Sequence, residues 1–256
     1  MAQLIDKYLS GTSGLLLPVA NKSLYPVAFQ DKSRLNYYAS LYSSIEINSS
    51  FYKIPQGTTM KKWAGDVPQN FKFTFKLFKE ITHAKNLQYD RQVIKKFFGS
   101  INQVGDKKGC LLLQFPGSFK VNNINRLGEL LNDIRLEDPH QHWKIAVEFR
   151  NADWYVESVI DFLEDNNCTL VVHDKGGYGT GFHDTNTDCV YVRFHGPGGS
   201  YRGSYDESYL SEFASYIQQW IEGGKTVYVY FNNTMGEAIQ NMELLRSLVQ
   251  ENFLIE

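Results

Sequence analysis

The segment KIAVEFRNADW, residues 144–154, has the alternation of a buried strand and ends in two opposite charges. Successive strand residues point to opposite faces, so Ile145, Val147 and Phe149 share one face and Glu148 and Arg150 share the other. A buried charge is costly unless it is paired. The segment therefore predicts a strand whose polar end belongs to a functional or structural site.

The same alternation recurs along the chain, separated by segments with helical spacing of apolar residues. The patterns predict strands at residues 8–12, 43–48, 71–76, 109–114, 144–150, 168–174, 189–195 and 225–232. They predict helices at about 31–42, 57–65, 90–103, 122–134, 154–165, 206–222 and 236–250. The segment at 176–188, GGYGTGFHDTNTD, is predicted to be a loop in place of a long helix.

Eight strands with helices between them predict an α/β fold, a (β/α)8 TIM barrel. Successive units are roughly 31 residues apart, as in a barrel of about 250 residues divided into eight units. An open doubly wound sheet is the alternative, because alternating strands and helices also build that fold. No GxGxxG or GxxxxGK[ST] motif follows the first strand, which favours the barrel. No linker divides the chain, so residues 1–256 are predicted to form a single domain.

The composition is that of a soluble globular protein, with 43% hydrophobic and 21% charged residues. The net charge of −2, without a basic run, argues against tight non-specific binding to nucleic acid. No signal-peptide pattern or membrane-spanning apolar run is present, so we expect no membrane partner and a cytoplasmic location. The cysteines Cys110, Cys168 and Cys189 are few and match no metal-binding spacing, so reduced, buried thiols are expected.

Each strand from the second to the eighth is predicted to end on an inward polar residue, at the barrel end where TIM-barrel enzymes carry their active sites. The sixth strand leaves its phase open, so either His173 or Asp174 faces inward. The candidate catalytic residues are Glu46, Glu148, Lys76 and Asp174. The candidate substrate-binding residues are Gln114, Arg150, Arg193, His195, Tyr230, Asn232, Asn48 and Tyr52. A structural alternative is a layer of ion pairs, with Glu46 neutralising Lys76, and Glu148 neutralising Arg150 or Arg193.

Eight segments resemble the YecE-like proteins, a domain of unknown function. They are GTSG (11–14), YYASLYSSIEINSSFYKIP (37–55), WAGDVPQNFKFTFK (63–76), ITH (81–83), LLLQFPGSF (111–119), VEFRNADW (147–154), YVRFHG (191–196) and VYFNNT (229–234). The resemblance implies a TIM barrel and supplies no activity; similarity to apurinic endonuclease and sugar isomerase barrels is an analogy. The chain departs from the family after GTSG, where it reads LLLPVANKSLYPVAF, so one wall of the pocket is expected to differ.

Three cations at one barrel mouth, Lys76, Arg150 and Arg193, suit an anionic substrate, because guanidinium groups match phosphate and carboxylate. Glycine-rich loops at 195–203 and 232–236 follow the last two strands, where barrels commonly bind phosphate; alternatively, these glycines only serve turns. Lys76 is either a base or Schiff-base amine with a pKa lowered by burial, or an ion-pairing or substrate-anchoring lysine.

These residues favour a metal-independent acid–base enzyme, a hydrolase, lyase or isomerase, acting on a small phosphorylated or carboxylated sugar-like molecule. Two carboxylates across the barrel would supply the acid and the base. No cofactor is predicted, although a single Mg²⁺ or Mn²⁺ on Glu46, Glu148 and Asp174 is left open. One alternative is a nucleic-acid-binding or repair-associated barrel, and another is a non-catalytic small-molecule-binding protein. The oligomeric state is left open.

Overall fold

A computed structural model describes residues 2–175 and 185–254 and contains a strand at every predicted position. The strands are β1 Tyr8–Thr12, β2 Ser44–Ile47, β3 Lys72–Lys76, β4 Lys108–Gln114, β5 Lys144–Glu148, β6 Cys168–Leu170, β7 Val172–His173, β8 Cys189–Phe194 and β9 Thr226–Phe231. The strand predicted at 168–174 is two short strands, β6 and β7, interrupted at Val171.

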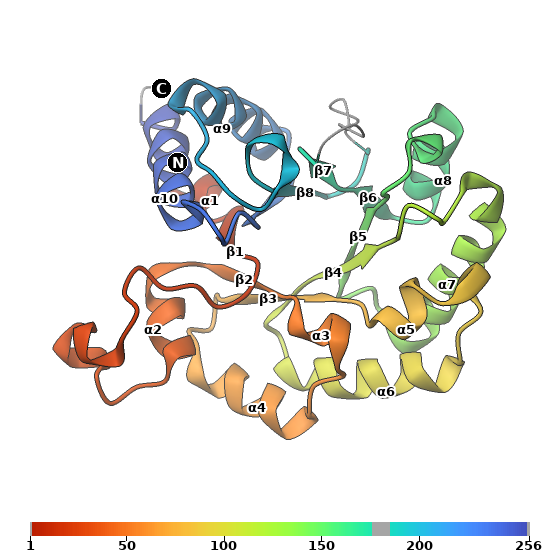
Figure 1. Cartoon of the computed structure of the whole chain (residues 1–256), viewed down its shortest axis with the longest axis horizontal. Coiled ribbons are helices and arrows are strands. Elements are labelled where there is room, and N and C mark those ends of the chain that lie inside the picture. Colours follow the sequence, from red (N-terminus) through yellow and green to blue (C-terminus); the bar gives the residue numbers. More distant parts are fainter. Residues whose placement is uncertain (1, 176–184, 255–256) are drawn as a thin grey trace.

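Helices surround the strands (Figure 1). They are α1 Ala2–Ile5, α2 Arg34–Leu41, α3 Ser49–Tyr52, α4 Gly57–Asp66, α5 Lys79–Thr82, α6 Arg91–Ile101, α7 Ile124–Glu137, α8 Glu157–Asp165, α9 Glu207–Glu222 and α10 Ala238–Asn252. All seven predicted helices are present. The short helices α1, α3 and α5 were not predicted, because four residues are too few to show a helical period. The predicted loop at 176–188 falls mostly outside the described residues.

The strands form two parallel sheets, in the orders β1-β9-β8-β7 and β2-β3-β4-β5-β6. The predicted fold is therefore confirmed as a mixed α/β fold with parallel sheets. The closed TIM barrel predicted from the sequence is not confirmed, because the strands form two separate sheets, with one seam between β1 and β2 and another between β6 and β8.

Side chains occupy the seam between β1 and β2. The Thr12 N–H donates to the Tyr38 hydroxyl at 2.7 Å, and this hydroxyl donates to the Ser44 carbonyl at 3.2 Å. One isolated parallel bridge joins Ser13 to Glu46. The tyrosine hydroxyl thus takes the place of a direct backbone hydrogen bond, which is why no ladder forms here.

Two threonines have the same role at the second seam, between β6 and β8. The Leu170 N–H donates to Thr185 Oγ1 at 3.2 Å, and Thr169 Oγ1 donates to the Cys189 carbonyl at 3.0 Å. Among the described strands, β6 pairs only with β5, and β7 pairs only with β8.

Two apolar clusters confirm the predicted phase of the strands. The outer cluster, which packs against the helices, contains the predicted outward residues, among them Ile45, Phe73, Leu111, Val147, Val192 and Val229. The inner cluster draws on strands of both sheets: Leu9, Cys110, Leu112, Ala146, Val171, Cys189, Tyr191, Tyr228 and Tyr230. The three cysteines are buried and free, as predicted. No helix in the described part of the chain has the length and apolar character that a membrane span requires.

Candidate functional site

The buried guanidinium of Arg193, on β8, lies at the centre of the site. Its Nε and Nη2 donate to the two carboxylate oxygens of Glu46 at 2.9 and 2.8 Å. Its Nη1 donates to Glu148 Oε2 at 2.6 Å. Glu46 lies on β2 and Glu148 ends β5, so one arginine joins strands of both sheets.

Both glutamates are fully buried and held as carboxylates. Burial alone would raise the pKa of Glu46, but Arg193, with hydrogen bonds from Ser13 (2.6 Å) and Tyr191 (2.5 Å), holds that pKa below its usual value. Burial likewise opposes ionisation of Glu148, but Arg193 and Arg150 hold its pKa well below normal. A carboxylic acid with a lowered pKa is a poor proton donor at neutral pH.

Arg150 pairs with Glu148 through Nη2, so the two charges of the KIAVEFR segment contact each other. The same Nη2 donates to His195 Nε2 at 3.0 Å. Arg150 Nη1 is buried and has no hydrogen-bond partner among the described residues. A buried guanidinium N–H without an acceptor is costly, so this atom is a candidate for binding an anion.

His195 is fixed on both sides of its ring. Its Nδ1 lies 3.3 Å from Asp174 Oδ1, and its Nε2 faces Arg193 Nη1 at 3.2 Å as well as Arg150. Burial lowers its pKa, although the hydrogen bond to Asp174 acts in the opposite direction. A neutral ring with its proton on Nδ1 satisfies all these contacts. The Tyr205 hydroxyl donates to the other oxygen of Asp174.

The sequence left open whether His173 or Asp174 faces inward at the sixth predicted strand. Both residues contribute to the site. His173 is opposite Arg193 in the β7–β8 register and contacts the Tyr155 hydroxyl through Nε2 at 3.0 Å. Its Nδ1 accepts from the Lys175 N–H at 3.2 Å. Burial lowers the pKa of His173 to about 4. Asp174, the next residue, reaches His195 from the strand end.

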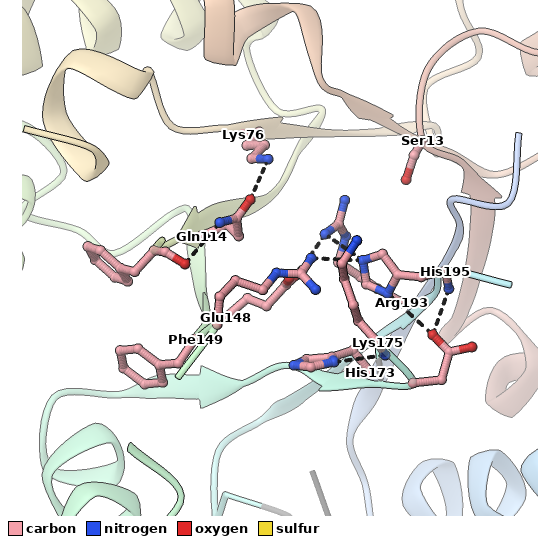
Figure 2. Close-up of polar contacts among 12 residues, drawn as sticks. Ser13, Lys76, Gln114, Glu148, Phe149, His173, Lys175, Arg193 and His195 are labelled. Carbon is pink, nitrogen blue, oxygen red and sulfur yellow. Dashed lines mark hydrogen bonds and ion pairs between the residues drawn. The ribbon is translucent and has the colours of Figure 1, made fainter. Parts of the chain in front are cut away.

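Lys76, at the end of β3, approaches from the other side of the site (Figure 2). Its Nζ donates to Gln114 Oε1 at 2.8 Å and lies 4.2 Å from the centre of the Phe51 ring. The predicted pairing of Lys76 with Glu46 is not among the ion pairs of the described residues, because Glu46 is taken up by Arg193.

A cavity of about 190 Å³ opens beside these cations. Its lining residues are Asn48, Tyr52, Lys76, Gln114, Arg150, Arg193, Tyr201 and Asn232. Every lining residue except Tyr201 is a predicted site residue, and none of them is acidic. Two cavities of about 430 and 550 Å³ lie elsewhere, the first beside β1 and Arg246 and the second between α3 and α6. Neither of these two cavities is lined by Lys76, Arg150 or Arg193.

Comparison with known proteins shows the family of the chain. The family model described as "Protein of unknown function DUF72" matches residues 9–255. The chain belongs to this family. The resemblance to YecE-like proteins is thereby confirmed. The chain is 26% identical over 248 residues to UPF0759 protein YunF of Bacillus subtilis, covering 84% of this chain and 85% of YunF. It is 21% identical over 142 residues to UPF0759 protein YecE of Escherichia coli, covering 56% and 49% of the two chains.

Crystal structures of DUF72 proteins share the fold. The protein from Enterococcus faecalis is 21% identical, with a TM-score of 0.77 over 95% of each chain. The protein from Thermotoga maritima is 24% identical, with a TM-score of 0.74 over 97% of this chain and 99% of that one. These likenesses establish the fold alone.

Several residues predicted for the site of this DUF72 chain lie outside the cavity lining. Glu46, Glu148, Asp174 and His195 lie around Arg193 and Arg150, and Tyr230 lies deeper. The Tyr230 hydroxyl contacts Ser44 Oγ at 2.5 Å and Thr74 Oγ1 at 2.7 Å, inside the strands. Alternation along a strand predicts which face of the strand a residue lies on, but not how deep in the protein it lies. The sequence therefore did not separate the residues that line the cavity from those buried around and below it.

The glycine-rich loops of the DUF72 chain pack on each other. A Cβ on Gly236 would lie 2.5 Å from Gly203 backbone atoms, and the Met235 N–H donates to the Tyr201 carbonyl at 3.1 Å. The Tyr201 N–H itself donates to the His195 carbonyl at 2.6 Å. These amides are used within the loops, which favours the turn interpretation of the glycines over a phosphate-binding one.

No group of three or more metal-ligating side chains occurs within residues 2–175 and 185–254. Each of the three carboxylates considered for Mg²⁺ or Mn²⁺ already has protein partners. Glu46 and Glu148 bind Arg193, and Asp174 contacts His195 and Tyr205.

Several contributors to the site were not among the predicted site residues; they include Ser13, Phe51, Tyr191, Tyr201 and Tyr205. Ser13 belongs to the GTSG motif and Tyr201 to the loop after β8, so both lay in segments already associated with the site. Phe51 follows β2 in the short helix α3, and Tyr205 lies in an irregular segment. Short helices and irregular segments have no hydrophobic period, so alternation could not indicate these two residues.

Proposed function

We propose that this protein binds a small anionic, sugar-like molecule in the 190 Å³ cavity and acts on it as an enzyme. The observation that carries the proposal is the lining itself, with Lys76, Arg150 and Arg193 and no acidic residue. The cavity is below the usual range of about 300–1,000 Å³ for ligand pockets, so a small molecule or one anionic group suits it.

The buried carboxylates have a positioning role in this proposal. Glu46 and Glu148 fix Arg193, and Glu148 also fixes Arg150, at the edge of the cavity. Arg150 Nη1 then provides an unpaired donor for a phosphate or carboxylate oxygen. Direct acid–base work by these glutamates, the expectation from the sequence, has less support because neither lines the cavity.

The closed (β/α)8 arrangement is part of the same proposal. The inner cluster combines residues of both sheets, and Arg193 links β8 to β2 and β5. These contacts support a single domain in which the two sheets form a ring with side-chain seams. The three free, buried cysteines support a cytoplasmic location.

A non-catalytic binding protein is the second candidate. It is favoured by the full ion-pairing of Glu46 and Glu148, which removes both predicted acid–base residues from the cavity. Under this alternative the same anion binds and is recovered unchanged.

Calorimetric titration with inorganic phosphate and ribose 5-phosphate tests the proposal, with ribose as the uncharged comparison. Arg150→Gln should weaken binding of both anions about tenfold or more, because a hydrogen bond to a charged group contributes roughly 1.5–3 kcal/mol. Arg126→Gln, at an exposed pair with Glu129 on α7, is the matched control and should bind as the wild type does. If neither anion binds the wild type, or if Arg150→Gln binds equally well, the anion site is wrong.

A further inference from the structure

Lys76 is an amine held in the cavity without a carboxylate partner. No ion pair involves its Nζ among the described residues; the ion pairs of the site are those of Arg150, Arg193 and His195. Its contacts are Gln114 Oε1 at 2.8 Å and the face of the Phe51 ring. Lysines that only neutralise a site have a carboxylate within reach, so this arrangement calls for another explanation.

Gln114 gives the amine a fixed direction. Its Nε2 donates to the Phe115 carbonyl at 2.9 Å, so its Oε1 is the atom presented to Lys76. A neutral amine can donate one N–H to this oxygen and keep its lone pair for another bond. An ammonium group would carry additional N–H donors, for which no acceptor is found among the described residues.

The surroundings make the neutral amine accessible. Burial, together with the neighbouring Arg193 and Arg150, lowers the pKa of Lys76 to about 8 against the pull of Glu148 and Glu46. About a tenth of the side chain is therefore unprotonated at pH 7 and about half at pH 8, and the unprotonated amine is the state that attacks a carbonyl carbon.

Two other lining residues have buried polar atoms without a partner in the described part of the chain. Arg150 Nη1 is a donor and requires an acceptor such as an anionic oxygen. Asn48 Oδ1 is an acceptor and requires a donor such as a hydroxyl group. A ligand that satisfies both atoms has an anionic group and a hydroxyl within one small molecule.

From this juxtaposition we infer that Lys76 forms an imine with a small hydroxylated aldehyde or ketone that carries a phosphate or carboxylate group. Arg150 binds the anionic group, Asn48 accepts from a hydroxyl, and Lys76 Nζ reaches the carbonyl carbon. The inference rests on the proposed anion site and adds the substrate class and the reacting atom.

The chemical step balances without an external oxidant or reductant. The lone pair of Lys76 Nζ forms a bond to the carbonyl carbon, and the carbonyl oxygen takes up a proton to give a carbinolamine. The nitrogen loses a proton to water, the hydroxyl group is protonated by solvent and leaves as water, and the C=N bond forms. The carbon–nitrogen double bond is then an electron sink for proton or carbon transfer at the neighbouring carbon.

Borohydride trapping tests the inference on the full chain. The protein is incubated with D-glyceraldehyde 3-phosphate, with tartronate semialdehyde or with uncharged glyceraldehyde, reduced with borohydride, and digested for peptide mass spectrometry. We expect the reduced adduct on Lys76 with at least one of the two anionic aldehydes, at least tenfold above glyceraldehyde. The arm that labels distinguishes a phosphate from a carboxylate. Inorganic phosphate should protect Lys76 from the phosphorylated probe.

Lysine variants provide the matched controls. Lys76→Arg keeps a positive charge but cannot form the imine, so it should abolish the adduct. Lys79→Arg, at an exposed lysine near Tyr52 that does not line the cavity, should leave labelling of Lys76 unchanged. Absence of an adduct from both anionic probes, or equal labelling of Lys76 and Lys79, overturns the inference. If phosphate still binds in that case, the anion site stands and only the imine fails.

Discussion

At the scale of single residues, Arg193 determines what its neighbours can do. Two buried carboxylates share its guanidinium, and Arg150 supplies the remaining positive charge to Glu148. Breaking a buried ion pair by removing one partner costs about 3–5 kcal/mol, against roughly 0–1 kcal/mol for an exposed pair. Because the two arginines are balanced by the two glutamates, Lys76 is left in the cavity without a carboxylate of its own.

The buried imidazole of His173 should make stability depend on pH. Its pKa is 6.5 in the ordinary state and about 4 in the folded protein, so between these values the unfolded chain binds a proton that the folded one does not. Stability therefore rises with pH across this window and falls as the pH is lowered. His173→Gln should remove about 1–2 kcal/mol of the increase between pH 5 and 6.5, since each proton contributes up to about 1.4 kcal/mol per pH unit.

Urea unfolding at a series of pH values measures this effect. The range above pH 5 separates it from the glutamates, whose lowered pKa values make stability fall only as the pH drops through and below their ordinary value of 4.5. Above pH 7 the variant and the wild type should have parallel pH profiles. Equal slopes from pH 5 to 6.5 would show that folded His173 protonates normally.

At the scale of elements, the approach of β1 to β2 depends on Gly11. A Cβ at this position would lie 2.0 Å from the Ser44 carbonyl oxygen and 2.8 Å from the Tyr38 hydroxyl that fills the seam. An alanine at position 11 must push the two strands apart. We therefore expect Gly11→Ala to lower the free energy of unfolding by about 1–3 kcal/mol.

Gly99, within helix α6, is the matched control. Nothing would lie within 4 Å of a Cβ there, and alanine is favoured over glycine in helices by about 0.5–1 kcal/mol. Gly99→Ala should therefore stabilise the protein in the same urea measurement. Equal stability of Gly11→Ala and the wild type would mean that the seam is not close-packed.

The regular elements were predictable from the sequence and the seams were not. Period-two alternation located every strand, because each has one face against helices and one against the inner cluster. The seams depend on Tyr38 and Thr185, whose hydroxyl groups lie far along the chain from some of the backbone atoms they contact. Such contacts leave no local pattern, so the sequence could not show where the strands of the predicted barrel would lack backbone pairing.

At the scale of the whole molecule, the sequence predicted which residues lie together but not what each of them contacts. Alternation brought Glu46, Glu148, Arg150 and Arg193 to one end of the strands, where the structure has them together. The alternative of an ion-pair layer anticipated the pairing of Glu148 with Arg150 or Arg193. It did not anticipate that Arg193 also binds Glu46, nor that the cations line the cavity while the glutamates do not. These contacts depend on how deeply each side chain is buried and on the two acceptor oxygens of each carboxylate. Only the folded structure specifies them.

The two sheets should unfold together despite their seams. Opening the four-stranded sheet removes Arg193 from Glu46 and Glu148 and also splits the inner cluster. Glu46 then has no arginine, and Glu148 keeps only Arg150. A partly unfolded state with one intact sheet is therefore unfavourable. We expect one cooperative transition, although chains longer than about 150 residues often populate intermediates.

Tryptophan fluorescence can follow the two sides separately. Trp63, Trp143 and Trp154 stack on or pack against phenylalanines of the five-stranded side, whereas Trp220 lies on α9, which packs on β9. In urea, fluorescence of the wild type, fluorescence of Trp220→Phe and far-ultraviolet circular dichroism of each protein should give one common midpoint per protein. An earlier midpoint by circular dichroism than by fluorescence in Trp220→Phe would show that the four-stranded side opens first. That result would mean that the ion pairs of Arg193 do not couple the unfolding of the two sheets. It would also contradict the single-domain arrangement proposed for the chain.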